Sequence, residues 1–548
     1  MVSGSKHRML RDITSIFGWG SAPKVMALLL VAPLCAAALA QRDVSTARSH
    51  QQQGVAYLDE HNLLKAVEEF RAAVADAPSD PAAHDYLGIA LAESNQNEEA
   101  AKEFAVAVRL SEDFAQAHFH LAMADNLLGR SAEAIREFVA TLRIEPQSID
   151  ARYALSAACW KLGDYEGAIQ LLRQVLKQNP PFAAEAHYNL GLELKQIGQL
   201  KEATRELQAA VGLEPDSVGY RTALCQTLTE NLDLDGALAL AQETIKLAPT
   251  NPGPHFDLAE ASRVKGDLAT AEAQFNQTLQ LDPRFPRAHR QLGLVLRQKG
   301  LYEAAVGQLQ EAVQEDSNDA EVRYLLGSVY LKLNESQHAL ENLTESVSSN
   351  PYDSAAHITL AAILNRLGRK DEAQEELKKA QALDDLKANA GRSRILLGSA
   401  AEHVRKGEID AAIGELRNAT ELSPEYTEAH FQLVLALQKK GAPAEQVERS
   451  LRRVIELKPD YAPAYLQMGL LLQREGQTEK ATEEFHRAVG LAPSLVDAHR
   501  ALAKLAQAAH DWRTAVAEFG AILVWMDDDR EARRGLSVSL AQRKKHPK

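Results

Sequence analysis

Histidine recurs along this chain at intervals close to 34 residues, a pattern that raises the possibility of a ladder of metal sites. The series comprises His50, His84, His118, His187, His255, His289, His357, His430 and His499. Zinc needs several ligands within about 2.0–2.3 Å of one ion, whereas equivalent atoms of neighbouring helical repeats lie roughly 10 Å apart, about one helix diameter. We therefore predict no metal site and no cofactor, and expect each histidine to be half-buried between paired helices.

Burial of this histidine series leads to a hypothesis about pH. A low-dielectric environment penalises the imidazolium, so we expect the buried rings to be neutral in the folded protein. Stability should then fall when the pH drops below about 6.5, where the unfolded chain binds protons that the folded chain does not.

Motifs that carry catalysis are absent from the sequence. It contains no Gly-x-Ser-x-Gly elbow, no phosphate loop ending in Gly-Lys-Ser/Thr, no Gly-x-Gly-x-x-Gly and no His-Glu-x-x-His. Glutamates are plentiful, but they are spaced among Lys and Arg as on a solvated helix face, for example at Glu375, Glu376 and Lys379. We predict that the chain is not an enzyme.

The histidines belong to a repeat that begins near Ala47. Fourteen units of 34 or 35 residues, with one of 39, begin at Ala47, Pro81, Ala115, Ile149, Ala184, Val218, Pro252, Pro286, Ala320, Ser354, Ser393, Thr427, Ala462 and Val496. Alanine holds the twentieth position in thirteen units, proline the thirty-second in ten and glycine the fifteenth in nine. Apolar residues follow helical spacing on both sides of the glycine, so each unit predicts two helices. One pair cannot bury its own apolar stripe, so stacked neighbours must complete the core.

The period and strings such as Ala186-His187-Tyr188-Asn189-Leu190-Gly191 resemble the tetratricopeptide repeat family. The resemblance covers residues 47–529 and implies an all-α fold, a right-handed α-solenoid of about fourteen helix-turn-helix repeats. Repeats 1–10 occupy residues 47–387, an insertion occupies 388–392, and repeats 11–14 occupy 393–529. A capping helix with a basic tail is expected at 530–548.

The resemblance also implies a concave groove lined by the first helix of each pair. The fifth, ninth and twelfth positions share one helix face, and we call them the groove positions. The candidate partner-binding residues are Phe119, Met123, Tyr153, Trp160, Tyr188, Leu192, Lys195, Phe256, Arg263 and Arg297. The aromatic group around Trp160 is the primary candidate, and the alternative is that these rings only pack against neighbouring helices. The family's carboxylate clamp, a Lys at the fifth position with Asn at the ninth, is missing from every unit.

The first 40 residues resemble a secretory signal peptide. A basic segment ends at Lys24, an apolar run follows over 25–34, and small residues finish Ala38-Leu39-Ala40. We predict cleavage after Ala40, a short linker over 41–46, and a periplasmic or secreted protein. The alternative is a chain tethered to a membrane by an uncleaved N-terminus, in which case the leader makes the only membrane contact.

Two cysteines remain after the leader is removed. Cys159 and Cys225 lie two repeats apart on buried faces, and helices stacked at about 8–10 Å hold them beyond the roughly 7 Å limit for a disulfide. We expect both to remain thiols.

Charge and repeat architecture together favour a binding protein. The formal net charge is −14, with 61 basic and 75 acidic residues, which disfavours nucleic acid as a partner. We predict a non-catalytic scaffold that binds a partner helix or extended peptide in the groove. Alternatives are a regulatory or substrate-presenting subunit of a cell-envelope enzyme or of a secretion or glycan assembly, and a self-associating solenoid.

Overall fold

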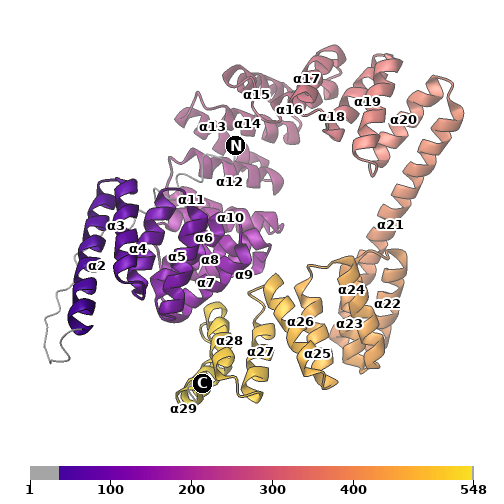
Figure 1. The fold of residues 1–548 in the computed structure, drawn as a ribbon. Coiled ribbons are helices and arrows are strands. Elements are labelled where there is room, and N and C mark those ends of the chain that lie inside the picture. The colour runs from indigo at the N-terminus through magenta and orange to yellow at the C-terminus, as the bar shows by residue number, and fades with distance from the viewer. Residues whose placement is uncertain (1–35, 546–548) are drawn as a thin grey trace. The chain divides into compact units, whose positions relative to one another are not determined.

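A computed structural model describes residues 36–545 of the chain. Its 28 helices, α2 to α29, follow one another without a strand among the described residues (Figure 1). The prediction of an all-α solenoid is therefore confirmed.

The helices form two compact units. The first unit consists of the described residues up to Leu171 together with those from Ala492 onward, and the second runs from Leu172 to Leu491. The helices of the first unit are α2 (Ala36–Asp59), α3 (Leu63–Asp76), α4 (Pro81–Glu93), α5 (Asn97–Leu110), α6 (Ala115–Leu127), α7 (Ser131–Ile144), α8 (Ile149–Leu162), α27 (Val496–Ala508), α28 (Trp512–Trp525) and α29 (Arg530–Lys545). Helix α9 (Tyr165–Lys177) contributes residues to both units.

The second unit is a continuous run of repeats. Its helices are α10 (Ala183–Gln196), α11 (Leu200–Leu213), α12 (Val218–Glu230), α13 (Leu234–Leu247), α14 (Pro252–Lys265), α15 (Leu268–Leu281), α16 (Ala288–Gln298), α17 (Tyr302–Glu315), α18 (Ala320–Lys332), α19 (Ser336–Ser349), α20 (Ser354–Arg366), α21 (Lys370–Lys406), α22 (Ile409–Leu422), α23 (Thr427–Lys440), α24 (Ala444–Leu457), α25 (Ala462–Arg474) and α26 (Thr478–Leu491).

Local sequence signals set the helix ends. The Asp80 side chain accepts a hydrogen bond from the Ala82 N–H while Pro81 opens α4, a combination suited to a helix N-terminus. Gly163 ends α8 with a φ of 92°, in the left-handed region that glycine enters at little cost. Asn95 takes the same role at a φ of 60° in another unit.

Close packing within each pair depends on a small residue in the first helix. A Cβ atom placed on Gly88 would lie 2.5 Å from the ring of Phe104, which is buried on the second helix of the same unit. Gly469 and Phe485 repeat this arrangement at 2.5 Å. The aromatic ring therefore fills the space that the missing side chain leaves, and the two helices approach closely.

Helix α21 departs from the helix-pair pattern. Its 37 residues join the second helix of repeat 10 to the first helix of repeat 11, so the predicted insertion, 388–392, lies inside one helix (Figure 1). The position that carries proline in most units is Asp385 here, and no other proline interrupts the segment. Without a residue that blocks the backbone hydrogen bonds, the helix continues.

The predicted leader falls mostly outside the described residues. Residues 1–35 are not described, so the signal peptide and its cleavage after Ala40 stay predictions. The predicted linker, 41–46, is helical, because α2 begins at Ala36 and no proline interrupts it before Asp59. Across the described residues, no helix has both the length and the apolar character needed to span a membrane.

In the first unit, segments more than 300 residues apart share one core. Helix α28 packs against α7. Trp525 is fully buried and belongs to the same apolar cluster as Phe138, Leu155 and Cys159. Cys159 and Cys225 are buried and form no disulfide, as predicted.

Polar contacts accompany this shared core. The Asp164 carboxylate accepts hydrogen bonds from the Ser494 N–H at 2.9 Å and from the Ser494 hydroxyl at 2.7 Å. The Gln170 side-chain amide donates to the Trp525 carbonyl oxygen at 2.6 Å. The last helix pair is therefore tied to the third and fourth repeats by buried apolar groups and by directed hydrogen bonds.

Candidate functional site

The fourth repeat position, which carries the histidine series, donates a hydrogen bond to a carbonyl oxygen in the turn before its own helix. His84 Nε2 lies 3.0 Å from the Pro78 carbonyl oxygen, and His499 Nε2 lies 2.9 Å from that of Pro493. Other donors in the same role are His118, Arg152, Arg221, His255, His289, Arg323, His357, His430 and Tyr465. Since Arg and Tyr replace His freely here, the position clamps the turn between repeats.

The other ring nitrogen faces the second helix of the same pair. His84 Nδ1 lies 2.7 Å from the Glu103 carboxylate, and a glutamate 19 residues further on occupies the same place for five other histidines: His50, His118, His187, His357 and His499. Where Nε2 also meets a carbonyl oxygen, both nitrogens face acceptors, so only the doubly protonated ring satisfies both. The expectation of neutral rings is therefore wrong for His84, His118, His357 and His499, because an imidazolium paired with a carboxylate replaces the buried neutral ring.

His430 is the exception that fits the original expectation. No carboxylate partner accompanies its hydrogen bond to Pro424 among the contacts of the described residues. Burial lowers the pKa of His430, the Pro424 carbonyl opposes that shift, and the positive charge of Arg453 reinforces it. Among the described side chains, no group of three or more His, Cys, Asp or Glu is arranged to hold a metal ion.

Four of the ten candidate groove residues lie in the first unit and are partly exposed. The Phe119 ring lies edge-on to Phe138 with centroids 5.8 Å apart, and the Trp160 ring lies 4.5 Å from that of Tyr165. Phe119, Trp160 and Met123 pack against the apolar cluster that contains Phe138. These side chains therefore combine a packed base with a solvent-accessible edge, and Tyr153 is likewise half-buried.

Tyr188 and Leu192 occupy the corresponding positions in the second unit. Both are half-buried against an apolar cluster that contains Leu207, and the Tyr188 and Tyr220 rings lie 4.8 Å apart. Burial raises the pKa of the Tyr188 hydroxyl. The pair forms a second, smaller aromatic surface in the second unit.

Phe256 belongs to the core, contrary to its assignment to the groove. It is 5% exposed, and its ring meets those of Phe275 at 5.4 Å and Phe285 at 5.1 Å. The turn before α16 carries Phe285 over the ring, and Arg287, which has a φ of 65°, places its guanidinium 5.6 Å from the ring centre. This proline-rich turn covers a side chain that the other repeats leave partly open.

The cationic candidates of the second unit all have partners within the chain. The pairs are Lys195 with Glu230 at 3.0 Å, Arg263 with Glu260 at 2.6 Å, and Arg297 with the Ser328 hydroxyl at 3.3 Å. Two of the three charges are therefore neutralised locally, so this stretch is a polar network with little excess positive charge.

Two buried carboxylates in the second unit escaped the sequence reading. Asp257 is 4% exposed and accepts a hydrogen bond from the Gln226 amide at 3.1 Å. Burial raises its pKa to about 6, against the opposing hydrogen bonds from Gln226 and Thr222. Asp257 therefore ionises just below neutral pH within the polar network.

Glu193 is the second of these carboxylates. It is 6% exposed, its Oε2 atom has no hydrogen-bond partner among the described residues, and burial raises its pKa to about 8. It holds the tenth repeat position, where other units carry Ala124, Ala158 and Val295. A glutamate at a position that is otherwise apolar was the signal available in the sequence.

Comparison with protein families places the repeats along most of the chain. Tetratricopeptide repeat models match residues 52–113, 87–149, 127–191, 184–217 and 462–495. A model described as the ARM repeat of tetratricopeptide repeat protein 21 matches residues 286–436. No curated protein matches the chain.

Three solved structures illustrate the likeness. A tetratricopeptide repeat protein from Parabacteroides merdae shares 15% identity over 46% of this chain and 99% of its own, with a TM-score of 0.35. MamA from Desulfovibrio magneticus shares 23% identity over 30% of this chain and 94% of its own, with a TM-score of 0.29. The complex of Naa15 and Naa10 bound to HypK matches at 15% identity over 92% of both chains, with a TM-score of 0.32.

At these TM-scores the solved structures carry no argument about function. The family models carry the assignment, because they match separate stretches from the first repeats to the thirteenth and agree with the helix pairs of the structure. This chain belongs to the tetratricopeptide repeat family.

Proposed function

We propose that the chain is a non-catalytic scaffold that binds a helix or extended segment of a partner protein along its groove positions. Tetratricopeptide repeats support a role in protein interaction. The observation that carries the finer proposal is the partial exposure of Phe119, Met123, Tyr153 and Trp160 beside fully buried neighbours such as Leu155. Exposed aromatic groups on a rigid, packed base are typical of binding surfaces.

The chemistry of this surface favours an apolar segment of a partner. The first-unit candidates carry no formal charge, and their rings are held by neighbouring rings, so they lose little conformational entropy on binding. An amphipathic helix can present apolar residues at helical spacing to such a row of anchors. In the second unit, a partner must instead exchange hydrogen bonds with the polar network around Arg263.

Affinity capture with a double variant tests the proposal. Trp160→Ala combined with Tyr153→Ala should lose the partners that the wild-type chain captures, while the helical circular dichroism signal remains. Tyr352→Ala is the matched control, because Tyr352 is 81% exposed in a turn between repeats, outside the groove positions. Capture that is unchanged in the double variant would contradict the proposal.

The identity of the captured partners separates the alternatives. An unrelated protein cross-linked at Met123 supports the scaffold, a separate catalytic chain supports the regulatory or substrate-presenting subunit, and recovery of the chain alone supports self-association. Export stays part of the proposal on the strength of the sequence before Ala40. Amino-terminal sequencing of the mature protein tests it, and a terminus at Gln41 is the expected result.

A further inference from the structure

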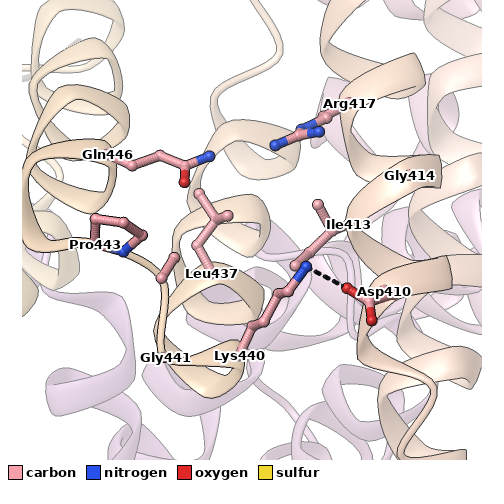
Figure 2. Close-up of a pocket in the computed structure, with 10 residues that line it drawn as sticks. Asp410, Ile413, Gly414, Arg417, Leu437, Lys440, Gly441, Pro443 and Gln446 are labelled. Atoms are coloured by element: carbon pink, nitrogen blue, oxygen red, sulfur yellow. Dashed lines mark ion pairs between the residues drawn. The ribbon is translucent and has the colours of Figure 1, made fainter.

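A pocket opens where the repeat pattern gains one residue. Helix α23 is followed by Gly441, Ala442 and Pro443 before α24 begins, whereas in other units two or three residues separate the helices and none of these is an extra proline. The pocket has a volume of about 350 Å³ and lies between α22, the end of α23 and the start of α24 (Figure 2). None of its lining residues holds a groove position, so it is separate from the proposed partner surface.

The lining divides into an apolar wall and a polar end. Ile413 and Leu437, both buried, face the pocket beside Pro443. Arg417 and Gln446 extend toward each other across it (Figure 2). The pocket therefore offers an apolar surface that leads to a guanidinium and an amide.

The charges of the pocket favour one class of ligand. Lys440 pairs with Asp410 at 2.5 Å at the opposite end, which cancels both charges (Figure 2). No ion pair of Arg417 occurs among those of the described residues, so its guanidinium leaves one net positive charge. A planar carboxylate matches the fork of a guanidinium, and the Gln446 amide can donate to the same group.

We propose that this pocket binds a carboxylate carried on a short aliphatic body. The carboxylate pairs with Arg417 and Gln446, while the aliphatic body lies on Ile413, Leu437 and Pro443. A volume of about 350 Å³ falls at the small end of ligand sites, which suits a group of this size. The carboxylate belongs either to a free small acid or to an acidic side chain of a partner flanked by apolar residues.

Ligand-observed nuclear magnetic resonance on the full chain tests the proposal. The probe is 4-methylpentanoate, its uncharged counterpart is 4-methylpentanamide, and saturation transfer to the methyl groups reports binding. We expect the acid to bind and the amide to bind at least about tenfold more weakly, because the amide lacks the charge-assisted hydrogen bonds. Equal binding of acid and amide, or no binding of the acid, would overturn the proposal.

Two variants separate the pocket from the rest of the surface. A Cβ atom on Gly414 meets nothing within 4 Å, so Gly414→Leu should fill the pocket without breaking α22 and should abolish binding. Gly307→Leu is the matched control, since Gly307 holds the same repeat position in α17 and is equally open. Binding that survives Gly414→Leu places the acid elsewhere and contradicts the proposal.

The cation is tested in the same way. Arg417→Gln should weaken binding of the acid about tenfold, whereas Arg452→Gln, at the same repeat position in the next unit and paired with Glu448, should leave it unchanged. Equal effects of the two variants would mean that general surface charge attracts the acid, which contradicts the proposal. Competition between the acid and a peptide with Glu between two Leu residues assigns the carboxylate to a partner side chain, and binding of the acid alone assigns it to a free small molecule.

Discussion

The two units are built from the same repeat, yet they differ in which parts of the chain complete their cores. In the second unit, helices in substantial contact are neighbours or next neighbours along the chain, throughout the described residues. In the first unit, α28 also packs on α7 and buries Trp525 among side chains of the third and fourth repeats. Stability should therefore add up from neighbour to neighbour in the second unit, whereas the first unit couples segments that are distant in sequence.

The largest effect is expected from removing the side chain at the centre of this coupling. Trp525→Ala should destabilise the first unit by about 3–5 kcal/mol, because it empties a fully buried site. Hydrogen exchange should accelerate in α7 and α28 together. Phe485→Ala, the matched buried aromatic of the second unit, should accelerate exchange only in α25, α26 and adjacent helices. Exchange in α7 that does not respond to Trp525→Ala would break the comparison.

The buried carboxylate of the second unit gives the next effect. Burial raises the folded pKa of Glu193 to about 8, above its usual 4.5, so the folded chain holds a proton that the unfolded chain releases. Its stability contribution is thus complete below about pH 4.5 and is lost as the pH rises through about 8. Glu193→Gln should remove this dependence and raise the unfolding free energy at pH 9 by on the order of 3 kcal/mol. Chemical unfolding from pH 5 to 9 measures it, and parallel curves for both chains would contradict it.

Two aspartates at the same repeat position sharpen the comparison. Asp164 caps its helix through the Gly167 N–H at 3.0 Å and also binds Ser494, whereas Asp267 contacts only its own turn, at Thr270. Asp164→Asn should cost about 2 kcal/mol and Asp267→Asn about 1 kcal/mol or less. A double-mutant cycle of Asp164→Asn with Ser494→Ala isolates the long-range bond. Equal costs for the two aspartates would show that only capping matters.

The histidine clamp should behave alike in both units, because it lies within one repeat. Burial alone would raise the pKa of Glu376, but the hydrogen bonds from Lys379 and His357 outweigh it and leave that pKa below its usual value. The stabilisation is therefore present above about pH 4.5 and is lost as the pH falls through the lower folded value. Glu376→Gln should cost about 1–2 kcal/mol at pH 7, and Glu137→Gln in the first unit should match it. Unfolding at pH 7 and pH 3 measures both, and a cost that persists at pH 3 would exclude the ion pair.

The smallest effect is expected at the edge of the long-range contact. Arg513 and Glu112 pair at 2.6 Å, but their side chains are 72% and 56% exposed. Arg513→Gln should cost less than about 1 kcal/mol, and added salt should remove the difference. A larger cost that persists in high salt would show that this pair contributes to the closure as much as the buried core does.

Sequence periodicity by itself determined the repeat, the helix pairs and most of the core. Alanine at the twentieth position and glycine at the fifteenth carry this information, because helix formation and packing between neighbours depend on residues a few positions apart, and the pattern recurs often enough to be read. It also located Phe119, Met123 and Trp160 on a partly exposed surface.

Tertiary structure decided what depends on a single partner at one place. Phe285 covers Phe256, Glu103 sets the protonation of His84, and an extra proline opens the pocket beside Arg417. The contact of Trp525 with the third and fourth repeats is the extreme case. A periodic pattern describes what every repeat has in common, whereas each of these contacts occurs once and joins groups whose proximity follows only from the path of the folded chain.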